Sequence, residues 1–233
     1  GQRRALYALL EAERAVAGLI FVTGRDLPFI EELCATTTVP WPDYVIGDVG
    51  TTIATVDQTA APGRRITPHA ALEAPIAALW ADRGDAVRAH LDGAAGLKPQ
   101  DTPFRYRMSY HYDPPAYDPA VETGIVEMGL DVLISADEFL DVLPKGVNKG
   151  SSLLRLIDHL RIAPQRVLVA GDTLNDLSLF ETGLPGVAVG NSEPALKAKL
   201  QGIDTTYHAD GHGAAGVQEA IRHFDFLPAN GGP

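Results

Sequence analysis

The chain contains 233 residues, 45% of them hydrophobic, which is enough to build a buried core in one or two domains. Its formal net charge of −11 argues against nucleic acid and against an anionic membrane surface as partners. The single cysteine, Cys34, excludes an internal disulfide framework, and no apolar run approaches the roughly 20 residues of a membrane span, so we expect a cytoplasmic protein.

Helices and strands alternate in the first part of the chain. The predicted elements are a helix over 3–14, a strand over 18–22, a helix over 26–36, and strands over 44–47 and 52–56. Asp26 is suited to cap the second helix, with Pro28 in its first turn. This order of elements is typical of an α/β fold with a parallel sheet.

The pattern changes between residues 57 and 144. It predicts helices over 72–80 and 85–91 and short strands over 104–112, 130–134 and 139–143. Helices and alternating strands grouped in this way are typical of an α+β unit with an antiparallel sheet. We therefore interpret residues 57–144 as an inserted second domain.

After residue 145 the alternation of helices and strands returns. The predicted elements are helices over 150–160, 176–181 and 214–223, a helix capped by Ser192, and strands over 167–171, 186–190 and 205–208. The sequence therefore predicts one α/β domain, built from residues 1–56 and 145–233, that carries the insertion.

Two carboxylates follow the apolar run that ends at Gly171. Asp172 would leave the carboxyl end of a buried parallel strand, where α/β sheets bind ligands, and Asp176 would lie one helical turn later. Two acidic groups aimed at one point repel each other unless a cation lies between them, and oxygen ligands suit Mg²⁺. The alternative is that Asp172 only caps the next helix and Asp176 only favours its first turn.

Thr23-Gly24-Arg25 follows another predicted strand in the same way. A hydroxyl and free backbone N–H groups before a helix form a cradle for phosphate. The alternative is an ordinary turn between a strand and a helix.

Lys145 and Lys149 lie at the start of the helix that precedes the acidic strand. Cations are disfavoured in the first turn of a helix, so a negative group is expected nearby, although a solvated turn is the alternative. Together with the carboxylates and Thr23, Lys149 would complete a site for phosphate and Mg²⁺ on one edge of the sheet.

These segments resemble three motifs of the haloacid-dehalogenase-like phosphatases. Residues 19–25, the Lys149-Gly150 helix start and Gly171-Asp-Thr-Leu-Asn-Asp176 are similar to the second, third and fourth motifs, in the same order. Residues 42–51, 141–146 and 207–216 resemble the sucrose-6-phosphate phosphatase group. The resemblance implies a Rossmann-like parallel sheet core with an inserted α+β cap domain.

The resemblance also implies a mechanism. An aspartate attacks the phosphoryl group to form an aspartyl-phosphate, and a second aspartate two residues later protonates the leaving sugar oxygen. Thr23, Gly24 and Lys149 would bind phosphate, and Asn175 would bind phosphate or a metal-bound water. Asp172 would ligate Mg²⁺, and Asp176 would ligate it or orient its waters. The catalytic set is then Thr23, Lys149 and Asp172.

The first motif of the family, Asp-x-Asp, does not occur in the 233 residues. We expect it on a strand upstream of Gly1, about 15–25 residues away by the spacing of compact α/β units. The alternative is a non-catalytic domain that binds or senses sugar phosphates, as part of or partner to a sugar-phosphate synthase.

The expected substrate is a small sugar monophosphate, most like sucrose-6-phosphate, with mannosylfructose phosphate or glucosylglycerate phosphate as alternatives. In this class the cap closes over the leaving group. Strand alternation places four polar residues on one face, as candidates for sugar contacts: Arg105, Arg107, Ser109 and His111. Asp48, with Thr51 and His212, could also reach the cleft, although all three could be plain surface residues.

Overall fold

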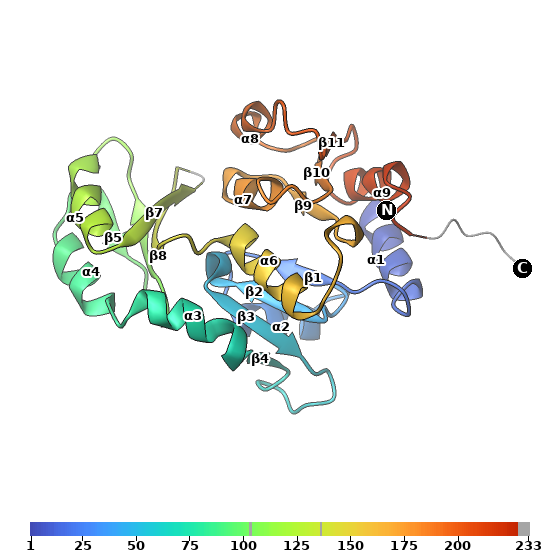
Figure 1. Ribbon diagram of the computed structural model, residues 1–233, viewed down its shortest axis with the longest axis horizontal. Coiled ribbons are helices and arrows are strands. Elements are labelled where there is room, and N and C mark those ends of the chain that lie inside the picture. The colour runs from blue at the N-terminus through green and yellow to red at the C-terminus, as the bar shows by residue number, and fades with distance from the viewer. Residues whose placement is uncertain (103, 136, 228–233) are drawn as a thin grey trace, which may run out of the picture.

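The computed structural model describes residues 1–102, 104–135 and 137–227, which form two lobes (Figure 1). The larger lobe contains parallel strand pairs, and the smaller lobe, from the middle of the chain, contains an antiparallel sheet. Over these described ranges, none of the helices has both the length and the apolar character required to cross a membrane.

The first sheet of the larger lobe contains four strands in chain order. They are β1 (Ile20–Val22), β2 (Tyr44–Gly47), β3 (Thr52–Val56) and β4 (Ile66–Pro68). β1 and β2 are parallel, whereas β3 and β4 extend the sheet antiparallel. The connecting helix α2 (Leu27–Thr36) begins where the Asp26 carboxylate accepts a hydrogen bond from the Phe29 N–H at 3.0 Å, as the sequence predicts.

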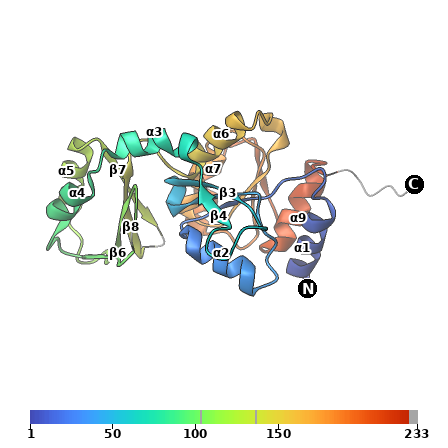
Figure 2. The ribbon, with the colours of Figure 1, turned by 90° about the horizontal axis from the view of Figure 1, so that it is seen from below.

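The second sheet of the larger lobe is wholly parallel. Its strand order is β11 (Thr206–His208), β10 (Gly186–Ala188) and β9 (Val169–Gly171). The helices of this part are α7 (Leu177–Phe180), α8 (Pro194–Lys199) and α9 (Ala214–His223). α1 (Gln2–Ala12) packs beside α9, which itself contacts β10 (Figures 1 and 2).

Helix α6 (Lys149–His159) joins the two sheets. Its buried Leu153 and Leu156 belong to the same hydrophobic cluster as Ile46 of β2 and Val169 of β9. The two sheets of the larger lobe therefore share one hydrophobic cluster, which is covered by α6.

The smaller lobe is an antiparallel sheet covered by helices on one side (Figure 2). Its strand order is β5 (Leu97–Pro99), β6 (Met108–Tyr112), β8 (Phe139–Pro144) and β7 (Leu130–Ser135). Its helices are α4 (Gly84–Leu91) and α5 (Glu122–Glu127), and α3 (Ala70–Trp80) connects the lobes, with Leu72 and Ile76 in the core cluster of the larger lobe. Trp80, Tyr110 and Leu140 lie in its separate hydrophobic cluster. The chain therefore has the expected α/β fold, a Rossmann-like core with an α+β cap.

Two details differ from the sequence prediction. The strand expected over 104–112 forms only over Met108–Tyr112, and the side chains of Arg105 and Arg107, which precede it, pair with distant carboxylates. In addition, β4 falls within 57–144 but pairs with β3 of the core sheet. We therefore propose that the insertion begins after Pro68, not at residue 57.

Candidate active site

Lys149 lies at the point where two distant segments meet. Its side chain is buried, and Nζ donates hydrogen bonds to Asp176 Oδ1 at 2.6 Å and to Asn175 Oδ1 at 2.7 Å. The helix start is fixed by Asn148, whose side chain accepts a hydrogen bond from the Ser151 N–H at 2.8 Å. The negative partner expected for a cation in the first turn of a helix is therefore Asp176.

Asp176 also shapes the turn after β9. Its Oδ2 accepts hydrogen bonds from the N–H of Asp172 at 3.0 Å and of Thr173 at 3.3 Å. Gly171 is required here, because a Cβ at this position would come within 2.6 Å of the Asp176 Cβ. Asp176 therefore connects the turn to the lysine, because Oδ1 binds Lys149 and Oδ2 binds the backbone N–H groups of the turn.

Asp172 is in a different situation. Its side chain is exposed, and within the described part of the chain its carboxylate accepts no hydrogen bond from another residue. Local desolvation raises the pKa of this carboxyl, and repulsion from Asp176 and Glu193 raises the pKa further, against the opposing effect of Lys149. A bound cation would stabilise the charged form of this carboxyl, which the neighbouring acids disfavour and to which no other residue of the described chain donates a hydrogen bond.

Glu193 supports the same turn, although no motif in the sequence marks it as a functional residue. Its carboxylate accepts a hydrogen bond from the Leu174 N–H at 3.0 Å, and its own N–H donates to the Asp172 carbonyl at 2.8 Å. The predicted cap by Ser192 is wrong. Its hydroxyl instead donates to the Gly171 carbonyl at 3.2 Å, and the residue that precedes α8 is Glu193.

The donor chemistry of this turn fits Mg²⁺ in part. Asp172, Asn175 and Asp176 offer only oxygen ligands, which hard cations prefer. Across residues 1–102, 104–135 and 137–227, however, no group of three or more His, Cys, Asp or Glu side chains is arranged to hold a metal ion. The oxygen donors of this turn are therefore too few to form a complete cation site by themselves.

Thr23 and Gly24 form the turn after β1. The Thr23 N–H donates to the Ile46 carbonyl at 2.8 Å, and the Thr23 hydroxyl oxygen accepts a hydrogen bond from the Arg25 N–H at 3.1 Å. The Thr23 carbonyl accepts a hydrogen bond from the Val49 N–H at 3.2 Å. This turn is therefore attached to the loop after β2.

That loop is the short 3-10 turn η1 (Asp48–Gly50), and it reaches the start of α6. Asp48 and Val49 both have a positive φ, 51° and 59°, which is an unusual conformation for a β-branched residue such as Val49. Gly50 lies so close to α6 that a Cβ would stand 2.3 Å from the Asn148 carbonyl carbon. Through η1, the Thr23 turn and the Lys149 helix start are held side by side.

Replacing Gly50 with Ala should therefore destabilise the protein strongly. Gly63 offers a matched control, because it also has a positive φ, 78°, but a Cβ there would meet no atom within 4 Å. We expect Gly50→Ala to lower the free energy of unfolding by about 1–3 kcal/mol more than Gly63→Ala, the usual cost of overpacking. Urea unfolding of both variants measures this difference, and equal losses would show that α6 does not press on η1.

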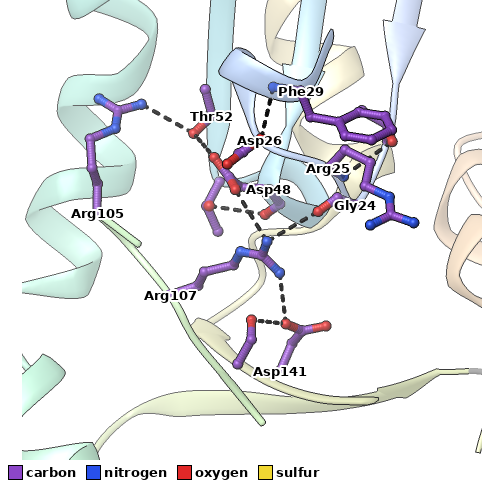
Figure 3. Close-up of polar contacts among 12 residues, drawn as sticks. Gly24, Arg25, Asp26, Phe29, Asp48, Thr52, Arg105, Arg107 and Asp141 are labelled. Carbon is purple, nitrogen blue, oxygen red and sulfur yellow. Dashed lines mark hydrogen bonds and ion pairs between the residues drawn. The ribbon is translucent and has the colours of Figure 1, made fainter. Parts of the chain in front are cut away.

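The five predicted sugar-contact residues have different positions. Arg107, Ser109 and Asp48 converge, because Arg107 pairs with Asp48 and with Asp141, which also accepts a hydrogen bond from the Ser109 hydroxyl (Figure 3). Arg105 instead makes two hydrogen bonds of 2.8 Å to Glu73. His111 is exposed against Phe139 and does not join this cluster. The sugar-binding role of these residues stays a prediction.

The two buried acids that pair with these arginines, Asp141 with Arg107 and Glu73 with Arg105, were missed from the sequence. Each interrupts an otherwise apolar stretch, Phe139–Pro144 or Ala70–Trp80, and a buried charge usually requires a partner. An acid within an apolar helix or strand was therefore the signal in the sequence that could have identified them. Of the loop residues, Thr51 is buried and bonds to the Asp48 carbonyl, and His212 lies near the start of α1.

Comparisons with known proteins agree with this fold. The model of the family described as "Sucrose-6F-phosphate phosphohydrolase" matches residues 1–225. The structure of the sucrose-phosphatase from Synechocystis sp. PCC6803 in complex with sucrose and phosphate is 30% identical, with a TM-score of 0.83, and the match covers 97% of this chain and 92% of that one. A haloacid dehalogenase-like hydrolase from Bacillus subtilis, 16% identical with a TM-score of 0.68, covering 97% of this chain and 85% of that one, shares the fold.

Two curated relatives differ in how much of their own length this chain spans. Glucosylglycerol-phosphate synthase from Pseudomonas anguilliseptica is 40% identical over 98% of this chain, which spans only 29% of that protein. Mannosylfructose-phosphate phosphatase from Agrobacterium fabrum is 28% identical over 90% of this chain and 84% of its own length. The matching family and these phosphatases are phosphoric monoester hydrolases. The chain belongs to the sucrose-6F-phosphate phosphohydrolase family, within the haloacid-dehalogenase-like phosphatases.

Proposed function

We propose that this chain binds the phosphate and the metal in a Mg²⁺-dependent phosphatase that hydrolyses a sugar monophosphate, most like sucrose-6-phosphate. The observation that carries the proposal is the meeting of Lys149 with Asn175 and Asp176, next to the turn that exposes Asp172. The sucrose and phosphate in the Synechocystis relative support this substrate class.

The phosphate group would lie between Lys149 and the Thr23 turn. An ammonium group has three N–H donors, and within the described residues two of those of Lys149 have partners, so one remains for a phosphate oxygen. The Thr23 hydroxyl oxygen already accepts a hydrogen bond from the Arg25 N–H, which leaves its own proton free to donate. Gly24 lets phosphate approach the backbone closely.

Asp172 is the residue proposed to ligate Mg²⁺ directly, because no other residue of the described chain donates a hydrogen bond to its carboxylate. Asp176 is committed to Lys149 and to the backbone, so its proposed role is to orient metal-bound water. Bound Mg²⁺ would neutralise negative charge on the phosphoryl group as it is transferred.

The nucleophile of this mechanism is an aspartate that we place outside the described residues. The family resemblance puts it on a strand that carries Asp-x-Asp, and the strand pairing supports this position. In the described chain β1 and β9 are each the end strand of a sheet, since β1 pairs only with β2 and β9 pairs only with β10. Residues of both strands belong to the hydrophobic cluster that α6 joins. A further parallel strand there would bring an aspartate to the edge that holds Thr23 and Asp172.

Glucosylglycerol phosphate is the second candidate substrate. The observation in its favour is the 40% identity to glucosylglycerol-phosphate synthase, of which this chain spans 29%. In that case the chain would be the phosphatase part of a larger sugar-phosphate synthase, or would act beside one, and would consume the product of a glycosyl transfer. Mannosylfructose phosphate is a further substrate to test, by likeness to the Agrobacterium protein.

A screen of phosphate release tests the proposal. We expect the intact protein to release phosphate from a glycosyl-sugar or glycosyl-polyol phosphate only in the presence of Mg²⁺. Its kcat/KM for that substrate should exceed that for glucose-6-phosphate by at least about tenfold. EDTA should abolish the release, and added Mg²⁺ should restore it. Calorimetric binding of these phosphates without any release would favour the non-catalytic alternative.

A further inference from the structure

The guanidinium group of Arg107 lies between the two lobes and contacts both (Figure 3). Arg107 is only 6% exposed. Nη1 donates to Asp141 Oδ1 of the cap strand β8 at 2.7 Å. On the core side, Nη2 donates to the Gly24 carbonyl at 3.0 Å and to Asp48 Oδ1 at 3.1 Å. The Phe104 ring lies 4.1 Å from the guanidinium carbon, so the group is also held by stacking.

The contact with the Gly24 carbonyl has a direct effect on Thr23. The Gly24 carbonyl and the Arg25 N–H belong to one planar peptide group. Arg107 holds the oxygen end of this group, and the hydrogen end donates to the Thr23 hydroxyl oxygen at 3.1 Å. Fixing the peptide plane therefore fixes which side of the hydroxyl accepts and which side is left to donate to phosphate.

The contact with Asp48 supports the turn from its other side. The second oxygen of Asp48 accepts a hydrogen bond from the Thr52 hydroxyl at 2.7 Å, so both oxygens have partners. Asp48 and Val49 hold left-handed backbone conformations, which persist only where the surroundings enforce them. Because the Val49 N–H donates to the Thr23 carbonyl, the Asp48 contact reaches the same turn.

The contact of Arg107 with Asp48 depends on the position of the cap, because Arg107 also neutralises a carboxylate of the cap. Asp48 comes from the core and Asp141 from the cap, and their side chains are 15% and 5% exposed. Arg107 is the cation that the two carboxylates share. Without it, two poorly solvated carboxylates would repel each other across the boundary between the lobes.

We propose that Arg107 is a positioning residue that couples docking of the cap to the phosphate-binding turn, an inference that rests on the proposed function. While the cap is docked, Asp141 anchors the guanidinium, and the guanidinium orients the Gly24 peptide and through it the Thr23 hydroxyl. Movement of the cap away from the core would withdraw this support and weaken the grip on phosphate, which favours release of the product.

Arg107→Met in the intact protein tests the inference, with Arg14→Met as the matched control. Arg14 also combines a carboxylate, Asp43 at 2.8 Å, with a backbone carbonyl, that of Trp41 at 2.6 Å, but it has one carboxylate partner instead of two and its contacts lie within the core. We expect Arg107→Met to weaken the binding of inorganic phosphate in the presence of Mg²⁺ by about tenfold, as measured by calorimetry. Arg14→Met should leave this affinity within about twofold of the unaltered protein.

Hydrogen exchange provides a readout that does not depend on the proposed function. The amides of Arg25 and Val49 should exchange at least about tenfold faster in Arg107→Met, while the amides of α9 should be unaffected. An unchanged phosphate affinity together with unchanged exchange at these amides would overturn the inference. If the unaltered protein failed to bind phosphate, the proposed function would fail, and exchange alone would decide the role of Arg107.

A double variant separates positioning from loss of stability. Arg107→Met with Asp141→Asn removes the repulsion between carboxylates but does not restore the contact to the Gly24 carbonyl. We expect this variant to recover thermal stability while its phosphate affinity and its Arg25 exchange remain altered. Recovery of all three properties would mean that Arg107 acts only by balancing charge, and the positioning role would be rejected.

Discussion

Replacing Asp172 with Asn should lower the rate of phosphate release by at least about 100-fold, the usual cost of removing one preorganised electrostatic group. The substitution keeps the shape of the side chain but removes the charge that would hold Mg²⁺. Among the described residues no other residue donates a hydrogen bond to the Asp172 carboxylate, so little of the local structure depends on it. Initial rates over a Mg²⁺ titration measure the effect.

The stability of the same variant should not decrease, which distinguishes a functional residue from a structural one. Partial burial, and after it repulsion from Asp176 and Glu193, raises the pKa of Asp172 in the folded protein, so at neutral pH its charge opposes folding. A neutral Asn removes that repulsion, and the urea midpoint without metal should stay equal or rise. Asp204→Asn, at an exposed loop position, is the control and should change neither property. Normal turnover by Asp172→Asn would contradict the metal assignment.

The meeting of Lys149 with the acidic turn was predictable from the sequence because each part has a strong local signal. An apolar run that ends in Gly171 identifies a buried strand, and a regular apolar face identifies the helix that Lys149 begins. A helix that precedes a parallel strand begins at the edge of the sheet where that strand ends. The local signals were therefore enough to predict that Lys149 and the acidic turn lie on the same edge.

The contacts of Arg105 and Arg107 were not predictable in the same way. Alternation of side chains suggested one long strand over 104–112, but the strand begins only at Met108. The partners of the two arginines, Glu73 and Asp141, are more than thirty residues away from them. Periodicity reports only which face of an element is apolar, and it does not identify which distant charge will satisfy a buried one.

The backbone of η1 lay beyond sequence reasoning for a related reason. Asp tolerates a positive φ, but Val49 rarely adopts one, and the letters Asp-Val-Gly do not indicate it. The conformation is imposed by Gly50 against α6 and by the bond from the Val49 N–H to Thr23. Tertiary contacts therefore determine the geometry of the predicted phosphate turn, which is why local propensity predicted its position but not its shape.

Replacing Lys149 with Met should both destabilise the protein and abolish phosphate binding. The lysine is 3% exposed, and its removal leaves Asp176 as a buried carboxylate without its cation. Breaking a buried ion pair from one side costs about 3–5 kcal/mol. Urea unfolding measures this loss, and calorimetry with inorganic phosphate and Mg²⁺ measures the change in affinity.

A double variant separates these two effects of Lys149. In Asp176→Asn combined with Lys149→Met, no buried charge is left unpaired, and an amide oxygen can still accept the N–H groups of Asp172 and Thr173. Most of the lost stability should therefore return. Asp176→Asn alone is the matched reference, because it keeps the lysine, and it should bind phosphate at least about tenfold more tightly than the double variant. Equal affinities of these two variants would show that Lys149 serves only to neutralise Asp176, and phosphate would have to bind elsewhere.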